Sequence, residues 1–311
     1  MHNQRVLVTG GAGFIGSNLA NRLAADNDVI AVDDTYLPER PRILIPRWSS
    51  SRPMSSTTTS PPTSTWSSTS PRSPRGTCTR AIPSAAAAST SRGSSTVVER
   101  ARETGSETVV YASTSSIYGS RTEPSPESMA VEAHTAYEAS KLARERYAEY
   151  YANHYDMAMA GLRFFSVYQG FGGNEKHKGE YANTVAQFAD AIANGEAPEL
   201  FGDGSQTRDF THVSDVARAC ELAADHELTG VYNVGTEEAY SFNEMVAMIN
   251  DALGTDIDPV YIECPFDGYV HDTMADYSTF HEATGWEPEI GFEEGVELVC
   301  EPYSERAPEE V

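Results

Sequence analysis

Val6-Leu-Val-Thr-Gly-Gly-Ala-Gly-Phe-Ile-Gly-Ser-Asn-Leu-Ala20 is the stretch that decides the fold. The run before Gly10 is short and apolar, as in a buried parallel strand, and residues 15–23 have helical spacing. Gly10, Gly13 and Gly16 let backbone N–H groups approach a pyrophosphate, which the positive end of the helix also attracts. A tight turn in an unrelated α/β protein is the alternative, but a strand, glycines and a helix in this order indicate a dinucleotide-binding turn.

An acidic pair after the next apolar strand indicates which dinucleotide binds. Asp33 and Asp34 follow a strand expected over residues 28–32. A carboxylate there accepts hydrogen bonds from the adenosine ribose and repels a 2′-phosphate, so it favours NAD over NADP. We therefore predict NAD as the cofactor. Its predicted contacts on this turn are Gly10, Gly13, Phe14, Ile15, Gly16 and Asp33.

The charge balance excludes several kinds of partner. The 311 residues carry 46 Asp and Glu against 22 Lys and Arg, a net charge of −24. Such a surface repels nucleic acid and anionic membranes, and it resembles the surfaces of halophilic proteins, although an ordinary acidic protein is the alternative. No run approaches the ~18 apolar residues of a membrane span. The first strand begins almost at Met1, so we expect a cytoplasmic protein without a signal peptide.

The four cysteines are scattered through the chain and form no CxxC pair. This arrangement indicates neither a disulfide framework nor a zinc site, and no metal is expected.

Residues 40–98 differ from the rest of the chain. They contain no Asp or Glu, eight Arg, and 34 Ser, Thr or Pro among 59 residues. A structureless loop of that length inside a compact domain is unusual, and a parallel sheet needs further strands here. A one-nucleotide frame shift, with G or C chosen for most free bases, turns Glu39–Pro71 into an acidic string ending in DVVVHLAA, a plausible strand. A reading-frame error over residues 38–96 and a genuine disordered insertion are both open, and sequencing the DNA distinguishes them.

Two further patterns supply candidate catalytic groups. Residues 108–114 read as a strand that ends in hydroxyl side chains, at the edge where α/β sheets bind ligands. Tyr137 and Lys141 stand at i, i+4 in a helix expected to run to about Tyr155, so they share one face. An ammonium beside a phenol favours the phenolate and lowers the pKa of the Tyr toward working pH.

The glycine turn, the hydroxyl-bearing strand and the Tyr-x-x-x-Lys pair, in this order, resemble the extended short-chain dehydrogenase/reductase superfamily. The closer resemblance is to its NAD-dependent nucleotide-sugar epimerases and dehydratases, with UDP-glucose 4-epimerase the nearest activity, and it covers nearly the whole chain outside residues 38–96. It implies that Tyr137 is the catalytic base and that Lys141 binds the nicotinamide ribose. It also implies that Thr114, four residues before Tyr118, is the catalytic Ser/Thr.

The resemblance implies an α/β fold, a Rossmann-like doubly wound parallel sheet with a smaller C-terminal α/β substrate-binding lobe. We assign residues 1–165 to the NAD-binding Rossmann domain and residues 166–311 to the lobe, with some segments returning to the sheet. The implied partners are a nucleotide-diphosphate sugar and a second copy of the chain, paired through the Tyr137 helix and its neighbour.

Later motifs are similar to the family's substrate-side signatures. Gly161–Tyr168 resembles LRxFNxYG, in which Phe165 matches the residue beside the nicotinamide and Ser166 replaces the Asn that contacts the sugar nucleotide. Phe201–Asp215 looks like GDGxQxRDFxHVxD. There Arg208 would bind the diphosphate, because a guanidinium presents a bidentate fork to phosphate oxygens.

Other positions carry weaker or missing signals. Lys178 lies in an HKG that resembles ADP-heptose 6-epimerases but stands about three residues further along, so we expect a solvated loop. His212 is expected to be structural, and Asp215 is expected to cap the following helix. The Arg that related epimerases place shortly before the Ala275–Asp276 dipeptide is missing.

The sequence therefore predicts an NAD-dependent epimerase acting through a transient 4-keto sugar. A 4,6-dehydratase, or another reductase or decarboxylase of nucleotide sugars, is the alternative. Ser115 and Ser116 disfavour it, because related dehydratases and decarboxylases carry acidic residues there. A second alternative is an inactive protein or scaffold, because residues 38–96 as written lack the strand expected beside the first one. The predicted substrate contacts are Thr114, Ser115, Ser116, Ser166 and Arg208.

Overall fold

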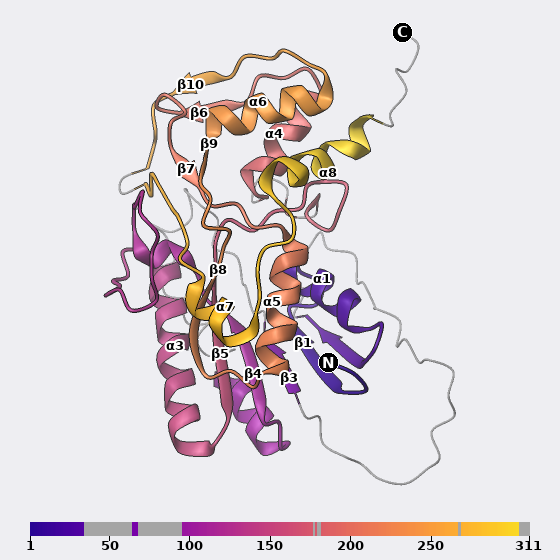
Figure 1. Cartoon of the computed structure of the whole chain (residues 1–311), viewed down its shortest axis with the longest axis vertical. Helices are drawn as coiled ribbons and strands as arrows, with labels where there is room; N and C mark the ends of the chain where they lie inside the picture. Colours follow the sequence, from indigo (N-terminus) through magenta and orange to yellow (C-terminus); the bar gives the residue numbers. More distant parts are fainter. Residues whose placement is uncertain (34–63, 68–94, 177, 179–181, 267–268, 305–311) are drawn as a thin grey trace.

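A six-stranded parallel sheet forms the centre of the molecule, in the order β2-β1-β3-β4-β5-β8 (Figure 1). The computed structural model describes residues 1–33, 64–67, 95–176, 178, 182–266 and 269–304. The strands are β1 (Arg5–Thr9), β2 (Asp28–Val32), β3 (Ser64–Ser67), β4 (Thr108–Ala112), β5 (Ala158–Phe164) and β8 (Gly230–Val234). The strand order reverses beside β1, which is where doubly wound sheets bind their ligands. The predicted Rossmann-like fold is confirmed.

Helices cover both faces of the sheet. One core lies beneath α1 (Phe14–Leu23), α5 (Val213–Asp225) and α7 (Ser278–Thr284). The other lies beneath α3 (Ala136–Tyr155) and the helix over residues 95–103. Successive residues of β4 belong to opposite cores, as a pleated strand requires. None of the described helices is long and apolar enough to cross a membrane.

A smaller lobe has its own hydrophobic core and lies beyond the carboxyl ends of the strands (Figure 1). Its short strands pair β6 with β10 in parallel and β7 with β9 antiparallel. Because α5, β8 and α7 come from later in the chain and return to the sheet, the predicted exchange of segments is visible, while the division at residue 165 stays a prediction. The elements of the lobe are α4 (Thr184–Ala193), β6 (Glu199–Phe201), β7 (Thr207–Arg208), β9 (Tyr240–Ser241), α6 (Phe242–Leu253), β10 (Val260–Ile262) and α8 (Phe292–Ser304).

A strand occupies the centre of the sheet where the chain as written was expected to lack one, so that expectation is wrong. β3 pairs Ser64 with Val6 of β1 and with Thr108 of β4. Parallel ladders are made by backbone groups, so a Ser- and Thr-rich segment is able to join one. β3 lies toward the end of Glu39–Pro71, where the reframed string places its strand. The rest of that segment lies outside the described residues, so the reading-frame error stays a prediction.

Side-chain caps determine where two important helices begin. Thr135 and Glu138 form a capping box at the start of α3, with Thr135 Oγ1 accepting the Glu138 N–H at 3.2 Å. α5 begins differently from the expectation. Nδ1 of His212 accepts the Ser214 N–H at 3.4 Å, so His212 is the N-cap and the predicted capping by Asp215 is wrong. Asp215 is buried and instead accepts two backbone N–H groups from the segment before α8.

Candidate active site

The glycine turn between β1 and α1 depends on the absence of side chains. Gly10 has a φ of 70°, in the region that favours glycine, and its carbonyl accepts the Gly13 N–H at 2.8 Å. A Cβ on Gly13 would lie 2.9 Å from that carbonyl oxygen, and a Cβ on Gly11 would lie 2.6 Å from Cβ of Ala31 in β2. The turn therefore packs closely against the neighbouring strand.

This turn fits the pyrophosphate of NAD. Among the described residues no side chain caps the N-terminus of α1, and its first turn, which includes Phe14 and Ile15, contains no acidic residue. Its N–H groups therefore suit an anion. The Asp33 carboxylate accepts the Ala12 N–H at 3.0 Å, so it lies beside the turn as ribose recognition requires. Gly16 is buried one turn further into the helix.

Tyr137 and Lys141 lie together at the carboxyl end of β4. The Lys141 ammonium is 5.3 Å from the centre of the Tyr137 ring and donates to the carbonyl of Ala112 at 3.3 Å. Lys141 is buried and Tyr137 half-buried. Ala112 stands two residues before Thr114, so the predicted base and its cation lie at the same end of β4 as the predicted hydroxyl.

Thr114 begins the 3₁₀ turn η1 (Ser115–Tyr118) at the end of β4. Its Oγ1 accepts the Ser116 N–H at 3.3 Å and lies 3.1 Å from the Ser116 hydroxyl. Ser115 is buried, whereas Ser116 is half-buried. The three predicted hydroxyl contacts therefore occupy one short, fixed segment.

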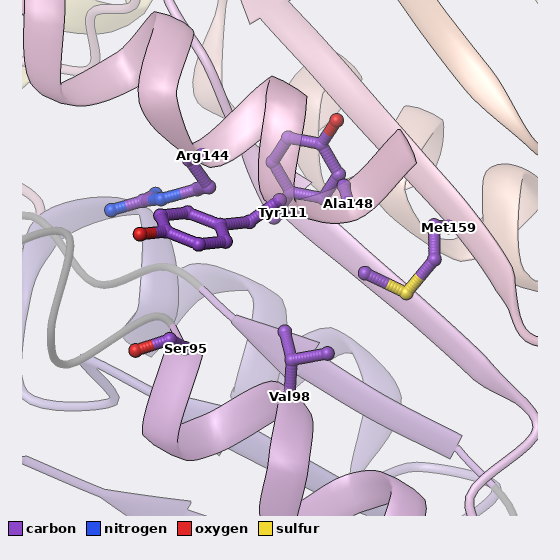
Figure 2. A pocket seen from close by; sticks show the side chains of 7 residues that line it. Ser95, Val98, Tyr111, Arg144, Ala148 and Met159 are labelled. Carbon is purple, nitrogen blue, oxygen red and sulfur yellow. The ribbon is translucent and has the colours of Figure 1, made fainter. Parts of the chain in front are cut away.

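Arg144 is a second cation at this site, and sequence reasoning missed it. It is buried and donates to the same Ala112 carbonyl as Lys141, at 2.8 Å. It stands beside Tyr111 in a small pocket between α3 and the helix over residues 95–103 (Figure 2). Burial lowers the pKa of Arg144 to about 10. Burial, assisted by the charge of Arg144, lowers the pKa of Lys141 well below its ordinary value. In the sequence, the spacing of three residues between Lys141 and Arg144 was the signal that could have found Arg144.

Replacing Arg144 with Met should raise the pKa of Lys141, because a neighbouring like charge is removed. If charged Lys141 is needed for turnover, the alkaline limb of the pH profile of kcat/KM moves upward by roughly one unit. Arg144→Lys keeps the charge and is the matched control, with little shift expected. An unchanged alkaline limb in Arg144→Met would contradict this coupling.

A buried polar network behind η1 was also missed. Arg163 forms two hydrogen bonds with Glu145, at 3.0 and 2.8 Å, and donates to the Tyr118 hydroxyl at 2.7 Å. Tyr118 in turn donates to the side chain of Asn233 at 2.8 Å. Glu145 stands four residues after Lys141, so a charged residue on a buried helix face was its sequence signal.

Phe165 and Ser166 follow β5 at the same edge of the sheet. The Phe165 ring is buried and stacks on Tyr118, with ring centres 6.1 Å apart. Ser166 is half-buried, and its carbonyl accepts the Asn183 side chain at 3.4 Å. Because Asn183 caps α4, Ser166 joins the sheet to the lobe.

Arg208 lies in β7 of the lobe, whereas the other predicted site residues lie on or directly after elements of the sheet domain. Its guanidinium donates to the carbonyls of Thr207 and His271, both at 2.7 Å, and to that of Val270 at 2.5 Å. It also lies over the Tyr269 ring, 5.2 Å from its centre. These contacts fix the guanidinium against the 270–271 segment, where the family's second Arg is missing.

Asp209, the next residue of the motif, ties three segments together. Its carboxylate accepts both the backbone N–H and the hydroxyl of Thr236, at 2.8 and 2.9 Å, and the backbone N–H groups of Glu237 and Ala275, both at 3.0 Å. Burial raises the pKa of Asp209 to about 6, although the hydrogen bonds act in the opposite direction. Asp209 therefore positions the strand that carries Arg208.

The solvated loop expected at Lys178 is wrong. Its side chain is 14% exposed and forms an ion pair of 2.8 Å with Glu175, which is fully buried. A loop rich in polar residues has no hydrophobic period, so no sequence pattern pointed to this burial.

The glycine turn, the acidic residue after β2 and the Tyr–Lys pair after β4 define an NAD-binding protein of the short-chain dehydrogenase/reductase type. The chain belongs to the NAD dependent epimerase/dehydratase family, whose model matches residues 6–44 and 77–235. The family resemblance and its cofactor, NAD, are confirmed. The match breaks off inside the anomalous segment.

Known proteins of this family are similar to the chain over much of its length. It is 32% identical to the UDP-glucose 4-epimerase of Mycolicibacterium smegmatis over 202 residues, which are 64% of this chain and 63% of that protein. The chain thus spans less than two thirds of the curated relatives it matches.

Solved structures are similar over nearly the whole chain. UDP-N-acetylglucosamine 4-epimerase from Methanobrevibacter ruminantium, in complex with UDP-N-acetylmuramic acid, has a TM-score of 0.82 and 26% identity, covering 97% of this chain and 98% of that one. The UDP-glucose 4-epimerase of Thermus thermophilus, in complex with NAD, has a TM-score of 0.78 and 27% identity, covering 97% and 100%.

Proposed function

We propose that this chain is an NAD-dependent epimerase of a nucleotide-diphosphate sugar, with a 4-epimerase of UDP-glucose type as the first candidate. The observation that carries the proposal is the Lys141 ammonium held beside the Tyr137 ring at the end of β4. The family, and the named activities of its relatives, support the same reaction class.

The chemistry assigns a step to each residue of the pair and its neighbours. NAD, held on the turn of Gly10 and Gly13 with Asp33 beside it, would supply the hydride acceptor and donor for the sugar carbon. Tyr137, beside the side chain of Lys141, takes the proton of the sugar 4-hydroxyl and later gives it back. Thr114 donates a hydrogen bond to the oxygen as it becomes the carbonyl of the 4-keto sugar. Arg208 binds the diphosphate, so the nucleotide stays in place while the sugar ring rotates.

The serines after Thr114 favour epimerisation over water loss. A dehydratase needs an acid and a base beside the sugar, and here Ser115 and Ser116 occupy the positions that follow Thr114. Neither hydroxyl has the acidity of a carboxyl group. A 4,6-dehydratase or decarboxylase is therefore the less favoured proposal.

Incubation of the purified chain with NAD and UDP-glucose, in high salt to suit its net charge of −24, tests the proposal. We expect UDP-galactose to accumulate until the two sugars reach equilibrium, with no net NADH; UDP-N-acetylglucosamine serves as the second substrate. Formation of a 4-keto-6-deoxy sugar would replace the epimerase with a dehydratase. No turnover, with NAD bound, would favour the inactive alternative. Light scattering on the same sample tests the predicted homodimer.

A further inference from the structure

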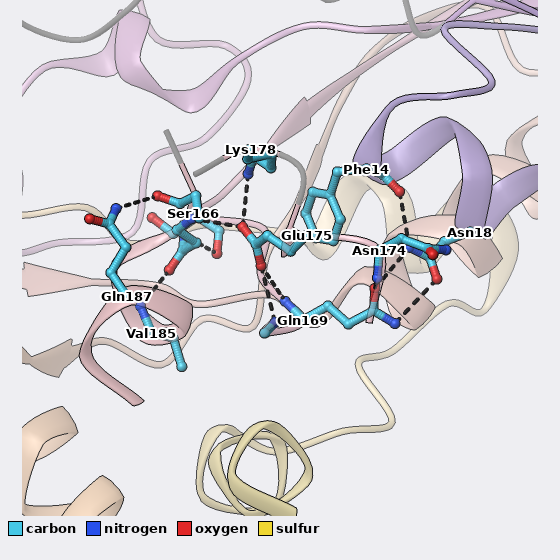
Figure 3. A network of polar contacts seen from close by, with 12 residues as sticks. Phe14, Asn18, Ser166, Gln169, Asn174, Glu175, Lys178, Val185 and Gln187 are labelled. Carbon is cyan, nitrogen blue, oxygen red and sulfur yellow. Dashed lines mark hydrogen bonds and ion pairs between the residues drawn. The ribbon is translucent and has the colours of Figure 1, made fainter. Parts of the chain in front are cut away.

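A buried carboxylate organises the loop after β5 (Figure 3). Glu175 is fully buried and accepts the backbone N–H groups of Gln169, Gly170 and Asn183, at 2.9, 3.1 and 2.7 Å. Its fourth partner is the Lys178 ammonium, at 2.8 Å. Three backbone N–H groups already stabilise the Glu175 carboxylate. The buried Lys178 is therefore not needed merely to neutralise Glu175.

The loop is fastened to the first two turns of α1. The side-chain amides of Asn18 and Gln169 bond each other in both directions, at 3.0 and 3.3 Å. The Lys178 ammonium lies 4.6 Å from the centre of the Phe14 ring, and Phe14 is the first residue of α1. Lys178 is thereby held beside the N-terminus of α1, the helix that follows the glycine turn.

Glu175 neutralises the Lys178 cation, and an anion bound here would be attracted both by the ammonium and by the N-terminus of α1. The N-terminus of a helix carries a partial positive charge, and a lysine beside it is repelled. No acidic residue lies in the first turn of α1, and among the described residues no side chain caps its N-terminus, where Gly13 is the N-cap residue. The loop after β5 and the glycine turn both lie at the carboxyl edge of the sheet, where the dinucleotide binds.

We propose that Lys178 binds the pyrophosphate of NAD and that Glu175 is the positioning residue that aims it. The proposal rests on NAD occupying the glycine turn and is independent of which sugar is turned over. A fixed ammonium also offsets the repulsion between an anionic dinucleotide and a chain with a net charge of −24. Glu175 also accepts the backbone N–H of Asn183, which is the N-cap of α4. The same loop therefore connects the glycine turn with the smaller lobe.

Calorimetric titration of NAD and of ADP-ribose, which shares the pyrophosphate, into Lys178→Met tests the proposal. We expect both dissociation constants to rise about 10-fold or more, as for loss of a charge-assisted contact, and their dependence on salt to weaken. Lys178→Arg should recover most of the affinity. Lys176→Met is the matched control, because it removes the same charge from an exposed residue of the same loop. It should bind NAD like the wild type.

Two further variants separate ligand binding from structure. Glu175→Gln should weaken NAD binding less than Lys178→Met, because the ammonium remains but loses its anchor. In the double variant Glu175→Gln/Lys178→Met no charge is left buried, and NAD binding should stay weak.

Three results would overturn the inference: wild-type affinity in Lys178→Met, recovery of affinity in the double variant, or a raised sugar KM with NAD affinity unchanged. Failure of the wild type to bind NAD would instead refute the cofactor seating on which it rests.

Discussion

Tyr137→Phe should lower the rate of epimerisation by about 10²–10⁴-fold, the usual contribution of a positioned acid–base group. The substitution removes one oxygen from a half-buried residue, and Lys141 keeps its bond to the Ala112 carbonyl. We therefore expect kcat to fall while the affinity for NAD and the unfolding temperature stay close to those of the wild type. Interconversion of UDP-glucose and UDP-galactose, followed by NMR, measures the rate.

The controls for this variant distinguish chemistry from binding. Tyr147→Phe removes the same hydroxyl from an exposed residue of α3 and should leave the rate unchanged. A Tyr137→Phe enzyme that retains more than a tenth of wild-type kcat would remove Tyr137 from its role as base. A large rise in the dissociation constant of NAD would instead assign the tyrosine to cofactor binding.

Residues carried by regular elements were predictable from spacing alone. Tyr137 and Lys141 share a helix face because i and i+4 always do, and the glycine turn must stand between its strand and its helix. Arg144 and Glu145 follow on the same helix, three and four residues after Lys141, and this spacing was the signal that the sequence contained, while their burial is seen only in the structure. Their partners were not predictable, because β5 and β4 meet α3 only in the folded chain.

The loop around Glu175 illustrates what spacing cannot supply. Asn18 and Gln169 are 151 positions apart and meet through a pair of amides that no period or motif announces. The prediction that Asp215 caps α5 was wrong for a related reason. Asp215 is the better capping residue by preference, but tertiary contacts gave its carboxylate to the segment before α8 and left His212 to cap the helix.

Glu145→Ala should destabilise the fold by about 3–5 kcal/mol, because it leaves the Arg163 guanidinium buried without its counter-ion. Both side chains are buried, and they share two hydrogen bonds. Burial alone disfavours the charge of Arg163, yet its bonds to Glu145 and Tyr118 raise its pKa above the ordinary value. Ser113 also loses the acceptor of its 2.5 Å hydrogen bond. Urea denaturation measures the loss of unfolding free energy.

The double variant Glu145→Leu/Arg163→Met tests whether the buried ion pair stabilises the protein more than two apolar side chains of similar size. Replacing both charges with apolar groups of similar size is often neutral, so we expect the double variant to recover most of the stability lost in Glu145→Ala. Its activity should fall, because among the described residues Asn233 is then the one hydrogen-bond partner left to Tyr118, and η1, which Thr114 begins, loses part of its support. A loss below about 1 kcal/mol in Glu145→Ala would show that water reaches Arg163 and that the network does not hold the site.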